Sequence, residues 1–427
     1  MVGMQRVLVI SNTALKRSNS NGDTILSLLS ALPSNHVMSF YLQNTDPDKG
    51  VANCSFRITD KERLHGFING SFSGTLIKDK DIAETIAADS RKRASYRESF
   101  LAHDIRAFIW RHGRWDKSFL YRSIEDFQPT AILVLASRTS FMLDIATEIA
   151  GKRGLPIVML TGENEYFRKP KTLNLWDHLF RRDLRRSYWK MMPHVTDIIV
   201  TNDKLAADYK DEFHKPVHVL MPSIKSALDS RPHLDGHGLI YGGNLEPYRY
   251  ESLEFISRAL QEVEPNEVIH VYSGDVSPSV KKRLARCANV FIHEPISKDE
   301  LIAAIRESKC VLHFESFGEK AKPLIQNAFS GKIAECLNSG VPFFVFAPRY
   351  CAFSPYFLAH GDAVDYVSEP EDLKQRLARV LKDAEYRRGL VEHAIPLVAK
   401  HHNEDVNSSI CLRILDGAVQ TGGHLDG

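Results

Sequence analysis

The sequence lacks the features that mark secreted, membrane-spanning and nucleic-acid-binding proteins. None of its six cysteines belongs to a C-x-x-C pair, so they provide neither a zinc signature nor a disulfide framework, and we expect a reducing, cytoplasmic environment. The apolar run Val7–Ile10 is too short for the apolar region of a signal peptide, and no apolar run approaches the roughly 18 residues of a membrane-spanning helix. Any membrane contact is therefore expected to be peripheral, at the inner face of the membrane. A net charge of +2 also argues against nucleic acid as a partner.

The composition and length predict a soluble protein with two domains. The apolar fraction of 43% and the charged fraction of 25% are ordinary for globular proteins, and 427 residues exceed the usual size of a single core. Turn-forming residues at 230–238 mark a linker. We expect an N-terminal domain at 1–230, a C-terminal domain at 231–390, and a last helix at 391–427 that packs back on the first domain before a flexible tail.

Short apolar runs alternate with longer helical patterns, which is typical of parallel sheets with crossover helices. The expected fold class is therefore α/β, with two doubly wound domains that face each other across a cleft. Between Asn44 and Lys92 the pattern weakens, and loops with one insertion are expected there. Two late helical stretches, Pro370–Lys382 and Asp405–Asp416, are expected to pack on the first domain. The strand candidates are Arg6–Ser11, His36–Leu42, Ala131–Leu135, Pro156–Leu160, Asp197–Thr201, Gly238–Tyr241, Val268–Ser273, Val290–His293, Cys310–Phe314 and Phe343–Phe346.

The stretch Ser330–Pro342 has the pattern of a helix that begins beside Gly331 and ends at Gly340. Lys332 and Glu335 lie three residues apart and therefore project from the same side of the first turn. A lysine for phosphate, a glutamate for sugar hydroxyls and the free N–H groups of a helix N-terminus together suggest a nucleotide-sugar site. An ordinary αβ unit with a surface ion pair has the same pattern.

Two further loops have glycines where a ligand can approach the backbone. Gly22 lies in the polar loop between the first strand and the first helix, an arrangement that can bind phosphate, although a plain βα turn has the same appearance. In the second half a strand enters Gly242-Gly243-Asn244, and Arg249 follows before the next helix. Gly243 permits close backbone approach, and Arg249 can place a positive fork on a diphosphate. A tight turn with a solvated arginine is the alternative.

From about Gly238 to Leu381 the chain resembles the C-terminal domain of GT-B glycosyltransferases, in particular the retaining family 4 enzymes (glycosyl transferases group 1). The order and spacing of several segments carry this resemblance, whereas the first half is similar only in outline. The resemblance implies a GT-B fold of two Rossmann-like domains, with an acceptor domain at 1–230 and a nucleotide-sugar donor domain at 231–390. The matching segments are Tyr241–Leu245, Val290–Ile296, Glu300-Leu301, Cys310–Gly318, Lys332–Glu335 and Gly340–Pro342.

The resemblance also implies roles for individual residues. Glu335 matches the second glutamate of the Glu-x7-Glu motif, which accepts hydrogen bonds from the donor ribose. Arg249 falls near the basic pair that steadies the departing diphosphate. Gly22 falls near the glycine that lets donor phosphate approach the backbone. The segment Ile292–Ser297, with Ile296, lies where such proteins hold the nucleotide base.

The chain departs from the family pattern at the first glutamate of this motif. Glu315 begins the Glu-Ser-Phe-Gly segment, but Glu335 follows twenty residues later. Either residues are inserted between the two glutamates, or Ser330 and Lys332 take over the role of the first one. Both alternatives remain open from the sequence.

Two other departures concern charged residues. Asn244 stands where many relatives have arginine, so Arg249 and Lys332 become the expected phosphate cations. Ala136-Ser137-Arg138 occupies the place of a histidine often found in the first domain, so no active-site histidine is assigned. Glu163 follows a predicted strand and can contact sugar hydroxyls, although a loop carboxylate without that role fits equally well.

The implied mechanism is electrostatic, with no cofactor and no metal. Two Asp-x-Asp matches, Asp46-Pro47-Asp48 and Asp79-Lys80-Asp81, lie in poorly patterned segments, and we expect solvated loops there. Cations and helix N-termini would instead stabilise the charge that develops on a departing nucleoside diphosphate.

Two basic, aromatic stretches lie in the first half, Arg91–Arg122 and Arg168–Lys190. A basic amphipathic helix with aromatic residues can lie on an anionic membrane surface and bring an enzyme to a lipid-linked acceptor. Packing of the apolar stripe inside the first domain is the alternative. The residues expected on the acceptor or membrane side are Arg138, Trp176, Arg181 and Arg185.

The sequence thus predicts a glycosyltransferase that moves a sugar from a nucleotide-diphosphate donor to a glycan or lipid-linked acceptor in polysaccharide or glycoconjugate synthesis. Retention of configuration follows from the resemblance to family 4. A nucleotide-sugar 2-epimerase of GT-B fold and a non-catalytic GT-B partner subunit are the alternatives.

Overall fold

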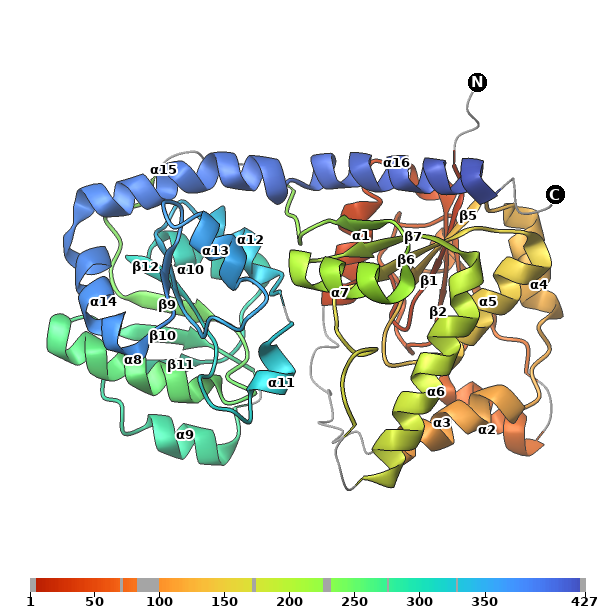
Figure 1. Ribbon diagram of the computed structural model, residues 1–427, viewed down its shortest axis with the longest axis horizontal. Coiled ribbons are helices and arrows are strands. Elements are labelled where there is room, and N and C mark those ends of the chain that lie inside the picture. The colour runs from red at the N-terminus through yellow and green to blue at the C-terminus, as the bar shows by residue number, and fades with distance from the viewer. Residues whose placement is uncertain are drawn as a thin grey trace. The chain divides into compact units, whose positions relative to one another are not determined.

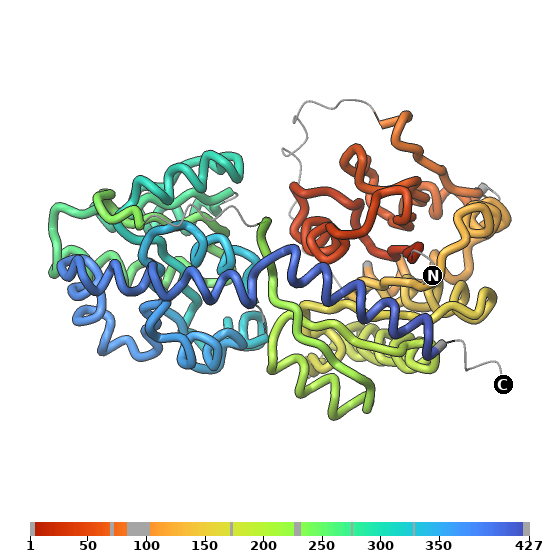
Figure 2. Tube along the Cα trace, turned by 90° about the horizontal axis from the view of Figure 1, so that it is seen from above, coloured from red at the N-terminus to blue at the C-terminus, as the bar shows by residue number. Residues whose placement is uncertain are grey.

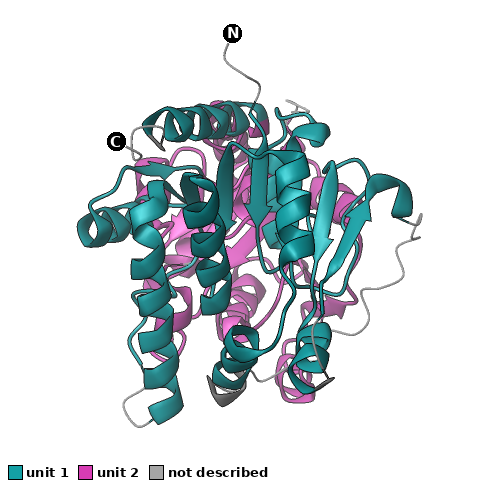
Figure 3. Ribbon diagram, turned by 90° about the vertical axis from the view of Figure 1, so that its right-hand side faces the viewer, with its two compact units in different colours: residues 1–220, 405–427 teal, residues 221–404 magenta. Residues whose placement is uncertain are grey.

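The computed structural model describes residues 5–69, 72–82, 100–170, 174–225, 232–274, 276–327 and 329–422. The chain forms two compact units, which Figure 3 shows in different colours. Unit 1 comprises residues 1–220 and 405–427, and unit 2 comprises residues 221–404. The domain boundary expected at 230/231 lies outside the described residues. Within the described ranges, no helix combines the length and the apolar character that a membrane crossing requires.

Unit 1 contains an eight-stranded sheet in the order β4-β3-β2-β1-β5-β6-β7-β8 (Figure 1). Every pairing is parallel except that of β4 with β3. Chain order reverses between β1 and β5, and open α/β sheets bind ligands at such a switch point, beyond the carboxyl ends of the strands. The strands are β1 (Val7–Ile10), β2 (Val37–Tyr41), β3 (Cys54–Arg57), β4 (Thr75–Lys78), β5 (Ala131–Leu135), β6 (Ile157–Thr161), β7 (Val195–Val200) and β8 (Val217–Val219).

Helices cover both faces of this sheet, as a buried parallel sheet requires. Leu8 and Ile10 of β1 pack on the face covered by α3, α4, α5, α6 and α7. Val7 and Val9 point to the opposite face, which α1 and α16 cover. The α-helices of unit 1 are α1 (Ser20–Leu28), α2 (Asp60–Asn69), α3 (Phe100–His112), α4 (Ser118–Phe127), α5 (Ser140–Arg153), α6 (Leu175–Met191), α7 (Asp203–Phe213) and α16 (Glu404–Gly422), and the 3-10 turns are Ser34–His36, Asp79–Asp81 and Met192–His194.

The last helix, α16, is the dark-blue helix near the C-terminus in Figure 2, and its apolar residues complete the core of unit 1. Its residues Cys411, Leu415 and Ala418 are fully buried against β1 and α1. The Ser408 hydroxyl donates to the carbonyl of Leu28 at 3.0 Å and accepts the N–H of Ala31 at 2.9 Å. A helix from the end of the chain therefore takes part in the same core as the first strand.

Unit 2 contains a six-stranded parallel sheet in the order β11-β10-β9-β12-β13-β14. Its switch point lies between β9 and β12. The strands are β9 (Leu239–Gly242), β10 (Ile269–Tyr272), β11 (Val290–His293), β12 (Cys310–Phe314), β13 (Phe343–Phe346) and β14 (Asp365–Val367).

On one face of this sheet, α8, α9 and α14 pack against apolar residues of the strands, and α15 packs on α12 and α14. The stretch Pro370–Lys382, expected on the first domain, instead forms a 3-10 turn and α14, whose Leu373, Leu377 and Val380 belong to the core of unit 2. The α-helices are α8 (Arg249–Val263), α9 (Pro278–Leu284), α10 (Lys298–Arg306), α11 (Lys322–Ile325), α12 (Lys332–Leu337), α13 (Ser354–Ala359), α14 (Leu373–Lys382) and α15 (Ala384–His401), with a 3-10 turn at Pro370–Asp372.

The expectation of loops between Asn44 and Lys92 is wrong for the described part of that segment. It contains β3, α2, β4 and a 3-10 turn, and its residues 70–71 and 83–92 lie outside the described ranges. The two strands have only four residues each, and β4 is an antiparallel edge strand, so neither has a long apolar run that a sequence pattern could reveal.

Gly22 lies inside α1, where the preceding loop folds back on the helix. A Cβ atom at this position would lie 2.6 Å from the carbonyl oxygen of Lys16 and 2.8 Å from that of Ala14, and both are backbone atoms that cannot move aside locally. We therefore expect Gly22→Ala to lower the free energy of unfolding by about 1–3 kcal/mol. Gly417→Ala is the matched control, because a Cβ atom at this position of α16 would meet nothing within 4 Å, and it should stabilise the helix by about 0.5–1 kcal/mol. Urea unfolding followed by circular dichroism measures both, and a Gly22→Ala variant as stable as the wild type would contradict this packing.

Candidate active site

A cavity of about 180 Å³ lies at the switch point of unit 2, beside the carboxyl end of β9 and next to β12. Side chains from β9, α8, α10, β12 and α12 line it. This is the position at which doubly wound sheets bind ligands. The polar residues of its lining are Tyr241, Asn244, Arg249, His313, Ser330, Lys332 and Glu335.

Lys332 and Glu335 reach this cavity from α12, together with Ser330 just before the helix. The Lys332 Nζ atom donates to the carbonyl oxygen of Gly242 at 2.6 Å, so the ammonium lies beside the glycine turn after β9. The Glu335 carboxylate forms an ion pair with Lys298 of α10, with 2.7 Å between Oε1 and Nζ. The structure thus brings together three residues that the sequence places in one motif. The helix has only six residues, however, so its dipole is small.

The glycine turn after β9 is fixed by hydrogen bonds of its own neighbours. The Tyr241 hydroxyl donates to the carbonyl of Asn244 at 2.9 Å, and the Asn244 side-chain oxygen accepts the N–H of Glu246 at 2.9 Å. A Cβ atom on Gly243 would lie 2.7 Å from that hydroxyl and 3.1 Å from Lys332 Nζ. Only glycine therefore leaves room for the lysine to reach the turn.

Arg249 does not present the free positive fork that the sequence predicts. Its Nε and Nη2 atoms donate to the two oxygens of Glu315 at 2.8 and 2.7 Å, and Nη1 donates to the carbonyl of Glu246 at 2.6 Å. Glu315 is only 2% exposed, and this burial raises the pKa of its carboxyl group while the adjacent guanidinium opposes the rise. The pair joins the start of α8 to the end of β12. Most donors of Arg249 are therefore already used within unit 2.

This pairing bears on whether Glu315 or Ser330 has the role of the first glutamate of the Glu-x7-Glu motif. Glu315 is not among the residues that line the cavity, although its partner Arg249 is, whereas Ser330 lines the cavity beside Lys332. In this arrangement Ser330 lies where a bound molecule can touch it.

His313 is a cavity residue that the sequence analysis missed. It lies in β12, is 6% exposed, and its Nε2 atom has no hydrogen-bond partner within the described part of the chain. Burial, followed by the nearby charges of Arg249 and Lys332, lowers the pKa of His313 to about 3, so the imidazole is neutral near pH 7. The sequence gives one indication of this role, because His313 is a single polar residue within the otherwise apolar strand Cys310–Phe314.

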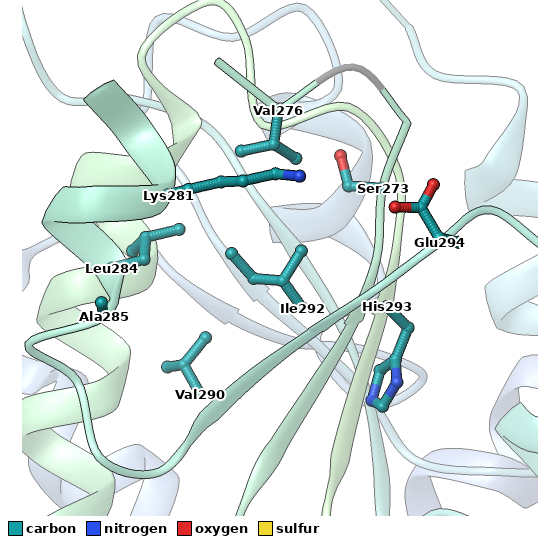
Figure 4. Close-up of a pocket in the computed structure, with 9 residues that line it drawn as sticks. All are labelled: Ser273, Val276, Lys281, Leu284, Ala285, Val290, Ile292, His293 and Glu294. Carbon is teal, nitrogen blue, oxygen red and sulfur yellow. The ribbon is translucent and has the colours of Figure 1, made fainter. Parts of the chain in front are cut away.

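A second and larger cavity, of about 480 Å³, lies further along the same sheet at β10, β11 and α9 (Figure 4). Ser273 comes directly after β10 and Glu294 directly after β11, so one end of the cavity opens at the carboxyl ends of the strands. Ile292, His293 and Glu294 of the segment expected to hold a base belong to its lining. Ile296 lies two residues beyond Glu294 and is 37% exposed.

The remaining predicted residues lie in unit 1. Glu163 is exposed in the loop after β6, where its carbonyl accepts the Thr161 hydroxyl at 3.1 Å. Arg138 follows β5, the strand at the switch point, and its Nε atom lies 3.6 Å from the Glu165 carboxylate. Gly22, as described above, is enclosed by backbone atoms of its own loop.

The three predicted residues on α6 have different environments. Trp176 is 43% exposed, as a surface contact requires. Arg181 is only 2% exposed and pairs with Asp177 at 3.1 Å and with Glu165 at 2.8 Å, so its expected place on the acceptor or membrane side is wrong. Arg185 is half-buried and donates to the carbonyls of Tyr166 and Arg168.

The two Asp-x-Asp matches serve local structure. Asp46 pairs with Arg57 at 2.9 Å, and Asp48 accepts the N–H of Arg17 at 2.6 Å. In the second match, Asp81 accepts the N–H of Lys78 at 3.1 Å at the start of a 3-10 turn. These bonds give each carboxylate a structural partner.

Comparisons with known proteins agree with this architecture. The sequence model of the family described as glycosyl transferase-like matches residues 240–407. A comparison with curated proteins finds no match. A sucrose-phosphate synthase from Thermosynechococcus elongatus is similar in structure at 11% identity and a TM-score of 0.60, with 98% of this chain and 100% of that chain covered.

Two other solved structures are also similar to this chain. A UDP-forming trehalose-phosphate synthase from Burkholderia xenovorans matches at 11% identity and a TM-score of 0.58, covering 96% of this chain and 100% of that chain. WaaG, a glycosyltransferase involved in lipopolysaccharide biosynthesis, matches at 12% identity and a TM-score of 0.52, covering 95% and 98%. At such identities the likeness shows the fold, and the family match covers residues 240–407, almost all of them in unit 2. The chain therefore has the GT-B fold, and its residues 240–407 are similar to the glycosyl transferase-like family.

Proposed function

We propose that the protein transfers a sugar from a nucleotide-diphosphate donor to a glycan or lipid-linked acceptor. The observation that supports this most directly is the cavity at the switch point of unit 2, where Lys332, Ser330 and Glu335 meet the glycine turn after β9. A cation can recognise a diphosphate, and a hydroxyl and a carboxylate can recognise the hydroxyls of a sugar.

In this proposal Lys332 is the main phosphate cation. One of its three N–H donors is used by Gly242, which leaves two for phosphate oxygens. Glu335, steadied by Lys298, accepts hydrogen bonds from the ribose. Arg249 holds Glu315 and the loop up to Glu246, so it supports the site and adds positive potential.

The transfer is proposed to retain the configuration of the sugar and to need no metal ion, as in the family 4 enzymes that the sequence resembles. The leaving diphosphate would then be stabilised by Lys332 and the potential of Arg249. Unit 1 would bind the acceptor at the carboxyl ends of its strands, where Arg138 and Glu163 lie. Polysaccharide or glycoconjugate synthesis is the proposed setting.

Donor hydrolysis and transfer test this function and the roles of two residues. With UDP-, GDP- and ADP-sugars, the wild type should release nucleoside diphosphate slowly without acceptor. Lys332→Ala should lower kcat about 100-fold through the lost transition-state charge. Glu335→Gln should mainly raise KM about tenfold through the lost ribose contact.

Lys282→Ala, an exposed lysine of α9 outside both cavities, is the matched control. Complete inactivity of the wild type, or full activity of Lys332→Ala, would reject the proposal.

The Arg249–Glu315 pair gives a prediction on stability. Arg249→Ala leaves the buried Glu315 carboxylate without a counter-ion, so unit 2 should lose about 3–5 kcal/mol. The double variant Arg249→Met/Glu315→Leu removes both charges and should recover most of this loss. Thermal unfolding of the single and double variants measures the difference. Equal destabilisation of both variants would mean that the pair is not the source of the effect.

We further propose that unit 1 contacts anionic membranes through the outer face of α6. Leu175, Trp176 and Trp189 are 67%, 43% and 52% exposed, and Arg182 and Arg186 are exposed on the same helix. Aromatic and basic side chains on one helix favour an anionic lipid surface.

Co-sedimentation with vesicles tests this contact. Binding should require anionic lipid and weaken with salt, and Arg182→Glu/Arg186→Glu should reduce it at least about tenfold, since each basic residue contributes about 1 kcal/mol. Lys282→Glu/Arg286→Glu, the same charge change on exposed residues of unit 2, should bind normally. Equal losses in the two variants would point to net charge alone.

A further inference from the structure

His313 is a polar residue inside an apolar strand, and it has no part in the transfer proposed above. In β12, Leu312 and Phe314 belong to the core that α8 and α14 cover, so strand alternation turns His313 to the opposite face. There it lines the cavity at the switch point. Its ring packs edge to face against Phe353, with 5.5 Å between the ring centroids, and this packing holds the ring in place.

The Nε2 atom of His313 lacks a hydrogen-bond partner among the described residues. The Oε1 atom of Glu315 lies 3.7 Å from it, which is too long for a hydrogen bond. Because the histidine is only 6% exposed, the unpaired atom lowers the stability of the protein, and an apolar residue of similar size would not have this cost. A ligand that enters the cavity can pair with this atom.

The charges beside the cavity favour an anionic ligand. Lys332 and Arg249 both line the cavity, and Arg249 is bound to Glu315. Burial, followed by the positive charges of Arg249 and Lys332, lowers the pKa of His313 to about 3. The imidazole is therefore neutral near pH 7 and carries a single N–H, which can donate one hydrogen bond. An anion whose oxygens only accept hydrogen bonds suits both the cations and this donor.

The neighbouring carboxylate indicates which nitrogen of His313 carries the proton. Oε1 of Glu315 is a hydrogen-bond acceptor on the Nε2 side of the ring, and such an acceptor favours the tautomer with the proton on Nε2. The N–H then belongs to the nitrogen that has no partner. The cavity of about 180 Å³ has the volume of several water molecules at about 30 Å³ each, so it has room for a phosphate group.

We propose that His313 donates a hydrogen bond from Nε2 to a diphosphate oxygen of the bound nucleotide sugar. This inference rests on the proposed donor function and adds a residue to which the family resemblance assigns no role. Lys332 supplies charge at the diphosphate, whereas His313 supplies a neutral donor in a fixed direction. Binding also pairs an atom that is unpaired in the free protein, so the histidine contributes affinity at a cost in the stability of the free protein.

Calorimetric titration of the full chain tests this contact. The ligands are UDP, GDP and ADP, together with pyrophosphate as a probe without base and ribose. His313→Leu should weaken the preferred nucleoside diphosphate and pyrophosphate at least about tenfold each, because a hydrogen bond to a charged group is lost. His313→Gln keeps an N–H donor and should bind within about threefold of the wild type. His270→Leu, which changes a histidine of β10 outside both cavities, is the matched control and should bind as the wild type does.

Thermal unfolding of the free protein separates this role from a structural one. His313→Leu removes a buried unpaired atom, so its Tm should equal or exceed that of the wild type. A lower Tm with equal losses of affinity in His313→Leu and His313→Gln would overturn the inference. Full diphosphate affinity in His313→Leu, or a loss that leaves pyrophosphate unaffected, would also overturn it, while donor hydrolysis by the wild type would still support the proposed function. A wild type that neither binds nucleoside diphosphates nor hydrolyses the donor would overturn both.

Discussion

A parallel sheet exposes apolar side chains on both faces, and each unit of this protein depends on covering both. Residues of β1 alternate between two separate cores, one on each face of the sheet. Val7 and Val9 belong to one core, and Leu8 and Ile10 belong to the other. Crossover helices satisfy this requirement and, as a consequence, leave the carboxyl ends of the strands to loops. Several polar residues of the candidate site, among them Asn244, Ser330 and Lys332, are found in such loops and the helices that follow them, whereas Tyr241 and His313 lie in the strands themselves.

The Arg249–Glu315 pair illustrates how the same constraint organises the site of unit 2. Glu315 ends a buried strand and has little access to water, so its charge needs a partner. Arg249, at the first turn of α8, supplies this partner with two parallel hydrogen bonds. Its third nitrogen fixes the turn that also holds Tyr241 and Asn244. The shape of the cavity near Lys332 therefore depends on the ion pair between Arg249, which lines the cavity, and the buried Glu315.

Much of the fold follows from sequence patterns, and the limits of those patterns have physical causes. The central strands of both sheets are continuous apolar runs and are confirmed nearly residue by residue, as for Ala131–Leu135 and Cys310–Phe314. Short edge strands such as β4 and β14 bury fewer residues than the central strands do, so they produce no long apolar run in the sequence. The GT-B fold follows from the order of the motifs in the second half.

The site was less predictable than the fold, because residue type alone does not tell where a charge is neutralised. Lys332 and Glu335 are brought together as their spacing predicts. Arg249 and Arg181, by contrast, each find a carboxylate inside the protein, from Glu315 at a distance of 66 residues and from Glu165 at 16. In the sequence His313 is only a single polar residue within an apolar strand. The cavity that it lines is formed by segments that are distant in the chain, so the sequence does not reveal it.

The participation of α16 in unit 1 has a consequence for biosynthesis. The ribosome delivers β1 and α1 first, but the face on which Leu415 and Ala418 pack stays without its cover until more than 400 residues have been made. During that interval the core that contains Ile25 and Leu28 lacks its last helix, while unit 2 already has the strands of its sheet. Unit 1 is thus the part of the nascent protein that depends most on protection from aggregation, and it closes its core last although its synthesis begins first.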